Sequence, residues 1–142
     1  REVSESRGLG DVYKRQADYC ASTGGDMGKA SLAYGRGKII NAAALYNTLA
    51  LDGVWLDFRD PDGCREETLY VKSMGFKGRF AIHPDQIKPI HDAYRPTTEE
   101  LEWAKGVLEE AKTAGSGAFK YQGKMVDAPV LAVARLIISR ED

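Results

Sequence analysis

The stretch "GVWLDFRDPDGCREETLYVKSMGFKGRFAIH", residues 53–83, decides the fold of this chain. Residues 53–58 and 79–83 are short apolar runs of the length that buried strands have. The segment between them begins with turn-forming residues and carries a helical pattern over residues 64–74, which Gly75 is suited to end. An order of strand, helix and strand indicates a βα unit with parallel strands.

The segments on both sides of this unit extend the same alternation. Residues 30–48 carry apolar side chains at helical spacing, and Pro84 is suited to open a further helix. A possible third strand ends near Asp18. Two or three strands cannot close a sheet, and an apolar parallel edge that stays open favours association with other chains. We therefore expect part of a larger α/β domain.

The tail of the chain has a different character. After Pro96, the T-x-x-E pattern of residues 97–100 predicts a helix that starts with a capping box. Residues 118–126 are typical of a small hairpin with its turn at Gln122–Gly123, and residues 128–139 predict a last helix. These elements form an appendage to the βα part, and we expect it to act as a lid.

Composition excludes several classes of protein. The chain has 142 residues, enough for one modest core, and its 20 Lys and Arg against 21 Asp and Glu give a formal net charge of −1. Nucleic-acid binding needs a basic excess, and a membrane span needs about 20 apolar residues, so we expect neither partner. Cys20 and Cys64 have no metal-like spacing, which favours a reduced, cytoplasmic chain.

Five positions are candidates for chemistry from the residues alone. Asp18 follows a possible strand, where barrel enzymes place catalytic groups, but it also fits a solvated loop. Asp57 is either an inward polar group or a surface residue, and His83 either contacts a ligand or caps the next helix. Asp127 precedes the last helix, so an N-cap is favoured over a general base on a mobile lid. Arg79 fits a phosphate contact or, more commonly, a solvated rim.

Three blocks identify a family. "GFKGRFAIHP" at 75–84, "RPTTEELEWA" at 95–104 and "GKMVDAPV" at 123–130 closely resemble the citrate lyase beta-subunit-like proteins of the HpcH/HpaI aldolase and citrate lyase superfamily. The likeness runs from about Ala17 to Ser139. It implies a (β/α)8 TIM barrel with a C-terminal helical extension. It also implies cleavage or formation of carbon–carbon bonds in citryl, malyl or citramalyl thioesters, usually of coenzyme A, with Mg²⁺ and in a homo-oligomer, trimeric or hexameric.

The resemblance also assigns roles to residues. Asp18 takes the place of a metal-ligating Asp, although Gln16–Ala17 stands where the family has an acidic residue in its "G-x-[ED]-D" block. Asp127 takes the place of an Asp that acts as catalytic acid/base in a neighbouring subunit, which reverses the preference for a mere cap. Asp57, together with His83 and Pro84, is a candidate for substrate binding.

The same resemblance predicts a fragment. A second metal-ligating Glu and a substrate-binding Arg belong to earlier strands of the family, so we expect the C-terminal two-fifths of a barrel enzyme, inactive alone. Residues 17–95 then form the last βα units and residues 96–142 the helical extension. Residues 6–16, "SRGLGDVYKRQ", match one reading frame of an adaptor used in transposon-based sequencing libraries. We therefore expect residues 1–16 to be non-native and without fold, against the alternative of a natural flexible arm.

Two alternatives to a lyase stay open. Within the family, the reaction could be thioester hydrolysis or a malate-synthase-like condensation, on coenzyme A or an acyl-carrier protein. Outside it, the chain could be a complete, non-catalytic binding module, which predicts a cooperatively folding monomer.

Overall fold

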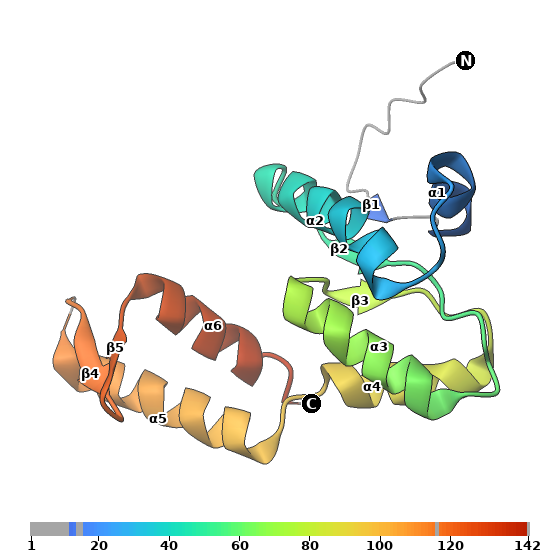
Figure 1. The fold of residues 1–142 in the computed structure, drawn as a ribbon. Helices are drawn as coiled ribbons and strands as arrows, with labels where there is room; N and C mark the ends of the chain where they lie inside the picture. The colour runs from blue at the N-terminus through green and yellow to red at the C-terminus, as the bar shows by residue number, and fades with distance from the viewer. Residues whose placement is uncertain (1–11, 14–15, 116, 142) are drawn as a thin grey trace. The chain divides into compact units, whose positions relative to one another are not determined.

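The computed structural model describes residues 12–13, 16–115 and 117–141. The chain forms two compact units, one up to Tyr94 and one from Arg95 (Figure 1). The first unit contains, in order, β1 (Val12–Tyr13), α1 (Gln16–Thr23), α2 (Lys29–Leu45), β2 (Ala50–Asp52), α3 (Pro61–Met74), β3 (Gly78–Arg79), the 3-10 helix η1 (Pro84–Gln86) and α4 (Ile87–Tyr94). The second contains α5 (Thr98–Ala114), β4 (Phe119–Tyr121), β5 (Lys124–Val126) and α6 (Ala128–Ile138).

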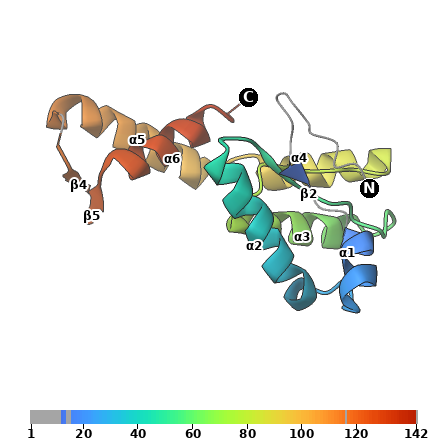
Figure 2. The same cartoon turned by 90° about the horizontal axis from the view of Figure 1, so that it is seen from above.

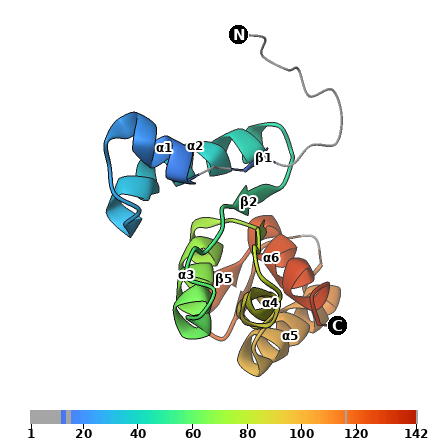
Figure 3. The same ribbon diagram turned by 90° about the vertical axis from the view of Figure 1, so that its right-hand side faces the viewer.

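The first unit is built on a parallel sheet of order β1-β2-β3. Leu51 pairs with Tyr13 on one side and with Gly78 on the other. Helix α2 packs against β1 and β2, and Figure 3 shows α1 beside α2. Helix α4 packs against α3 and β3. The core lies between α2, β2 and α3, where Ala43, Ala50, Val71 and Phe76 are buried together.

The helix ends follow the expected local chemistry. Gly75 ends α3 at a φ of 117°, a left-handed conformation that glycine adopts without steric cost. Thr97 and Glu100 form both bonds of the capping box at the start of α5. The helices expected over residues 30–48 and 64–74, and after Pro96, are therefore confirmed within a few residues.

Both strands expected from the opening stretch are placed differently. β2 ends at Asp52, before the expected range of 53–58, and β3 ends at Arg79, where the range 79–83 begins. At the end of β2, the carbonyl of Gly53 accepts a hydrogen bond from the side chain of Arg79, at 3.1 Å, in place of a backbone ladder bond. The apolar runs that follow are loops at the end of the sheet.

The first residues also depart from expectation. Residues 1–11, 14 and 15 lie outside the described residues. Val12–Tyr13, expected to be without fold, pairs with β2, and Gln16 is the first residue of α1. Strand pairing uses backbone groups that every non-proline residue carries, so side-chain patterns do not exclude it. Asp18 lies in the first turn of α1, not at the end of a strand.

The second unit packs two helices and a hairpin. Figure 2 shows the β4–β5 hairpin at the end of the α5–α6 pair, as expected from residues 118–126. Gln122 and Gly123, at the turn, have φ values of 47° and 77°, which fit a tight hairpin turn. Ala104, Val107, Val126 and Ala134 form the buried core of this unit. In the part of the chain that the structure describes, no helix is both long and apolar enough to cross a membrane.

Candidate functional site

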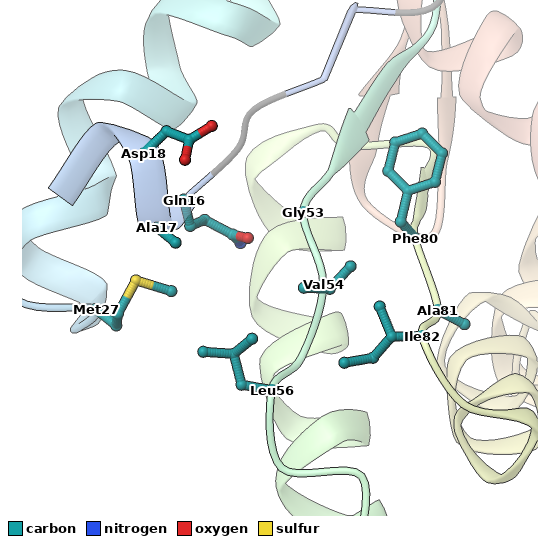
Figure 4. Close-up of a pocket in the computed structure, with 10 residues that line it drawn as sticks. All are labelled: Gln16, Ala17, Asp18, Met27, Gly53, Val54, Leu56, Phe80, Ala81 and Ile82. Carbon is teal, nitrogen blue, oxygen red and sulfur yellow. The ribbon is translucent and has the colours of Figure 1, made fainter. Parts of the chain in front are cut away.

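A large cavity lies at the carboxyl edge of the parallel sheet. Its volume is about 610 Å³. Its walls come from the residues after β2, the residues after β3 and the start of α1 (Figure 4). The lining residues are Gln16, Ala17, Asp18, Met27, Gly53, Val54, Leu56, Phe80, Ala81 and Ile82. Parallel α/β proteins bind their ligands at this edge, so the cavity is the candidate functional site.

The walls of the cavity are mainly apolar. Leu56 is 58% exposed and Ile82 is 56% exposed, although both are large aliphatic side chains. In Figure 4, Val54 and Ile82 point toward each other from the two loops. Such a site suits a ligand with an apolar part.

Asp18 brings a carboxylate to the wall of this cavity. Its oxygens are the ligand type that Mg²⁺ prefers, and Mg²⁺ sites often contain only one or two carboxylates. Among the described residues, however, no three His, Cys, Asp or Glu side chains gather around a possible metal position. The described chain therefore fits one ligand of a Mg²⁺ site and not a whole site.

The other residues predicted beside it lie apart from the cavity. Asp57 is exposed and its Oδ1 accepts a hydrogen bond from the amide of Arg59 at 3.0 Å, which stabilises a turn. It lines a smaller neighbouring cavity, together with Leu56 and Arg79. His83 is the N-cap of η1: its Nδ1 accepts from the amide of Asp85 at 3.2 Å. Its ring stacks on Phe58 with 4.7 Å between centroids. Pro84 is exposed at the start of η1. In the described part of the chain, the large cavity is lined by other residues than Asp57, His83 and Pro84.

Below the cavity lies a buried ionic cluster that sequence reasoning missed. Asp52, the last residue of β2, is fully buried. Arg36 of α2 binds its two oxygens through Nε at 3.1 Å and Nη2 at 2.9 Å. Arg79 of β3 binds Oδ2 at 2.9 Å, and so Arg79 lies neither on a solvated rim nor at a phosphate site. The side chain of Gln16 also donates to Oδ2, at 3.3 Å.

The cluster is balanced in charge. Glu67 of α3 lies 2.8 Å from Nη1 of Arg36 as an ion pair, although the angle is not that of a hydrogen bond. Burial opposes the charge of Arg36, but the hydrogen bonds and charge of Asp52, together with the negative charge of Glu67, outweigh it and raise the pKa of the guanidinium. Two cations and two anions thus fix the ends of β2 and β3 under the cavity. The signal in the sequence was Arg36, which lies four residues after buried Leu32 on the same helix face.

In the second unit, Asp127 is the N-cap of α6. Its Oδ1 accepts a hydrogen bond from the amide of Val130 at 3.2 Å. The capping interpretation of this residue is thus confirmed, whereas the acid/base role stays a prediction. Capping holds the carboxylate in one place at the junction of β5 and α6, which is also what a proton-transfer group requires.

Comparison with known proteins gives the family context. A family model described as a C–C bond lyase of the TIM-barrel fold matches residues 37–141. Mitochondrial citramalyl-CoA lyase of Rattus norvegicus is 36% identical over 127 residues, which cover 86% of this chain. The citrate lyase subunit beta-like protein of Mycobacterium tuberculosis H37Rv is 42% identical over 105 residues, which cover 74%. In both cases the chain spans about 38% of the relative's length.

A solved structure is similar over most of the chain. The CitE protein of M. tuberculosis, in complex with magnesium, acetoacetate and coenzyme A, superposes with a TM-score of 0.77 at 34% identity. The match covers 92% of this chain and 51% of that one. The resemblance to citrate lyase beta-like proteins and the expected fold class, part of a TIM barrel, are confirmed. The chain belongs to the family of carbon–carbon bond lyases with the TIM-barrel fold.

Proposed function

We propose that this chain is part of a Mg²⁺-dependent lyase that cleaves a carbon–carbon bond in 3-hydroxyacyl thioesters of coenzyme A. The family match carries the proposal, because it includes the loops after β2 and β3 that line the cavity. The names of the relatives, citramalyl-CoA lyase and citrate lyase subunit beta, define the substrate class. The complex of the similar structure with magnesium and coenzyme A supports both ligands.

Asp18 is the proposed metal ligand of this chain, and the remaining protein ligands come from outside its described residues. Bound Mg²⁺ supplies a Lewis acid at the oxygens of the substrate. The free thiols of Cys20 and Cys64, both buried, suit a reducing compartment, and we propose a cytoplasmic homo-oligomer.

Asp127 is the proposed acid/base. Its carboxylate takes the proton of the 3-hydroxyl group, and the bond between C2 and C3 of the acyl chain breaks. The electron pair of that bond moves to C2 as the thioester enolate, while C3 becomes a carbonyl. A proton then returns to C2, so the products are a carbonyl compound and a shorter acyl thioester. Apolar walls such as those of Leu56 and Ile82 keep water from the enolate.

A chimera tests this function. The upstream half of the M. tuberculosis citrate lyase subunit beta-like protein is joined to residues 17–142, and cleavage of citramalyl-, malyl- and citryl-CoA is assayed with and without Mg²⁺. We expect Mg²⁺-dependent cleavage, reduced about 100-fold or more by Asp18→Asn and by Asp127→Asn. Asparagine is as good an N-cap as aspartate, so the second variant removes the acid/base and keeps the cap.

The control is Asp85→Asn, an exposed aspartate of the same unit as Asp18. It should retain full activity. The 142-residue chain alone should show none. Thioester hydrolysis without carbon–carbon cleavage would assign the thioesterase reaction instead, and a folded chimera without any cleavage would contradict the lyase.

A further inference from the structure

A single buried side chain connects the two loops that form the apolar walls of the cavity. Gln86, in η1, is 1% exposed. Its Nε2 donates a hydrogen bond to the carbonyl of Trp55 at 2.7 Å, and its Oε1 accepts one from the amide of Ile82 at 2.9 Å. Trp55 belongs to the loop after β2 and Ile82 to the loop after β3. One amide therefore connects backbone groups of the two loops that line the cavity.

The position of Gln86 is itself well determined. Its amide closes the turn of η1 by donating to the carbonyl of His83 at 3.1 Å. Pro84 fixes the backbone at the start of that turn, and His83 caps it. A side chain that starts from a fixed turn and makes two short bonds has few other conformations available.

The bonded groups lie next to the side chains that form the walls. Leu56 directly follows Trp55, and Ile82 itself points into the cavity. A change at Gln86 would thus alter the spacing between Leu56 and Ile82 without touching either side chain. It would leave Asp18 and the ionic cluster at Asp52 unchanged, because neither contacts Gln86 through these bonds.

We propose that Gln86 is a positioning residue that sets the width of the cavity and thereby selects the acyl group by size. The selection of an acyl group rests on the proposed lyase function. Only an amide can make both bonds: glutamate keeps the acceptor for Ile82 but places a carboxylate oxygen against the carbonyl of Trp55, and methionine makes neither bond.

The first test measures selectivity in the chimera. Citramalyl-CoA and malyl-CoA differ by one methyl group, so the ratio of their kcat/KM values reports the fit of the cavity. We expect Gln86→Met to change this ratio about fivefold or more, mainly through KM, with a smaller change in Gln86→Glu. The matched control is Gln122→Met on the exposed hairpin turn, which should leave the ratio unchanged. A ratio unaltered by Gln86→Met, with both rates lowered equally, would overturn the proposal.

The second test needs no activity. In the 142-residue chain, we expect the bond to Gln86 to protect the amide of Ile82 from hydrogen exchange. In Gln86→Met we expect this amide to exchange about tenfold faster, while amides in the middle of α3 keep their rates. Equal acceleration in both places would mean a general loss of stability and would contradict the positioning role. If instead the wild-type chimera lacks lyase activity, the proposed function fails. The exchange measurement still shows whether Gln86 fixes the positions of the two loops.

Discussion

Asp52 shows how much one buried carboxylate determines at the end of a strand. Arg36 and Arg79 both depend on it for charge balance, and both are almost completely buried. Removing one partner of a buried ionic group leaves the other charges without compensation, which is far more costly than the net value of the pair. The stability of the ends of β2 and β3 therefore depends strongly on whether residue 52 carries a charged carboxylate.

We predict that Asp52→Asn lowers the free energy of unfolding of the first unit by about 3–5 kcal/mol. Asparagine keeps the size of the side chain but leaves two buried guanidinium groups facing one remaining carboxylate, that of Glu67. Urea unfolding followed by fluorescence measures the change. Trp55 and Trp103 are the two tryptophans, one in each unit, so a Trp103→Phe background restricts the signal to the first unit.

The matched control is again Asp85→Asn, whose carboxylate is exposed beside His83. Exposed ion pairs contribute little, so its effect should stay within about 0.5 kcal/mol. Equal effects of the two variants would show that Asp52 is not the centre of a buried charge network.

At this scale, sequence reasoning missed Asp52. The apolar run that follows it directed attention to Asp57, whereas β2 ends at Asp52 and places that carboxylate in the buried cluster. The substrate-binding role of Asp57 stays a prediction. Successive side chains along a strand point to opposite faces of the sheet. An error of one residue in the position of a strand therefore assigns the wrong side chains to its buried face. Gly75, the capping box and the cap at Asp127 were predictable because each depends on adjacent residues alone.

Among the elements, the contact of α5 with the β4–β5 hairpin depends on the absence of a side chain. A Cβ at Gly106 would overlap the hydroxyl oxygen of Tyr121 and lie 2.7 Å from its ring carbon Cζ. We predict that Gly106→Ala lowers the free energy of unfolding of the second unit by about 1–3 kcal/mol, despite the higher helix propensity of alanine. Urea unfolding in a Trp55→Phe background, where Trp103 reports, measures it.

A double-variant cycle checks the cause. Tyr121→Phe removes the overlapping oxygen, so part of the loss should disappear when it is combined with Gly106→Ala. The comparison variant is Gly37→Ala in α2, where a Cβ would meet no atom within 4 Å and the propensity gain should prevail. Stabilisation by Gly106→Ala would contradict the close contact.

Elements differed in how well the sequence predicted them. The helices from α2 onward were predictable from periodicity and caps, whereas α1 lies where the end of a strand was expected. The three strands of the sheet have only two or three residues each. Strands this short carry almost no alternation, and their pairing depends on residues far away in the sequence. The sequence could predict that a cavity lies at the carboxyl edge of these strands, but not which residues line it.

For the whole molecule, the exposed cavity walls predict association. Leu56 and Ile82, on the two loops of the cavity, each leave more than half of a large aliphatic side chain in water. Exposed apolar surface that is gathered in one place marks interaction or aggregation sites. We predict that the 142-residue chain self-associates at micromolar concentration, and that Leu56→Ser combined with Ile82→Ser reduces the associated fraction severalfold. Sedimentation velocity over a concentration series measures it.

Leu45→Ser provides the control, because Leu45 is even more exposed, at 78%, but lies at the end of α2 and does not line the cavity. It should change the association far less. A wild-type chain that stays monomeric and unfolds in one sharp transition would instead favour the non-catalytic binding module.

The order of the two units along the chain also affects when each can fold during synthesis. The first unit pairs Tyr13 with Leu51 and Leu51 with Gly78, whereas the hairpin of the second pairs Tyr121 with Lys124. Pairings between distant residues form slowly and local ones quickly. The second unit has roughly 50 residues, which a ribosome adds in roughly 3–10 s. During translation, the slowly folding unit therefore emerges first and has those seconds to form its sheet before the rapidly folding unit is complete.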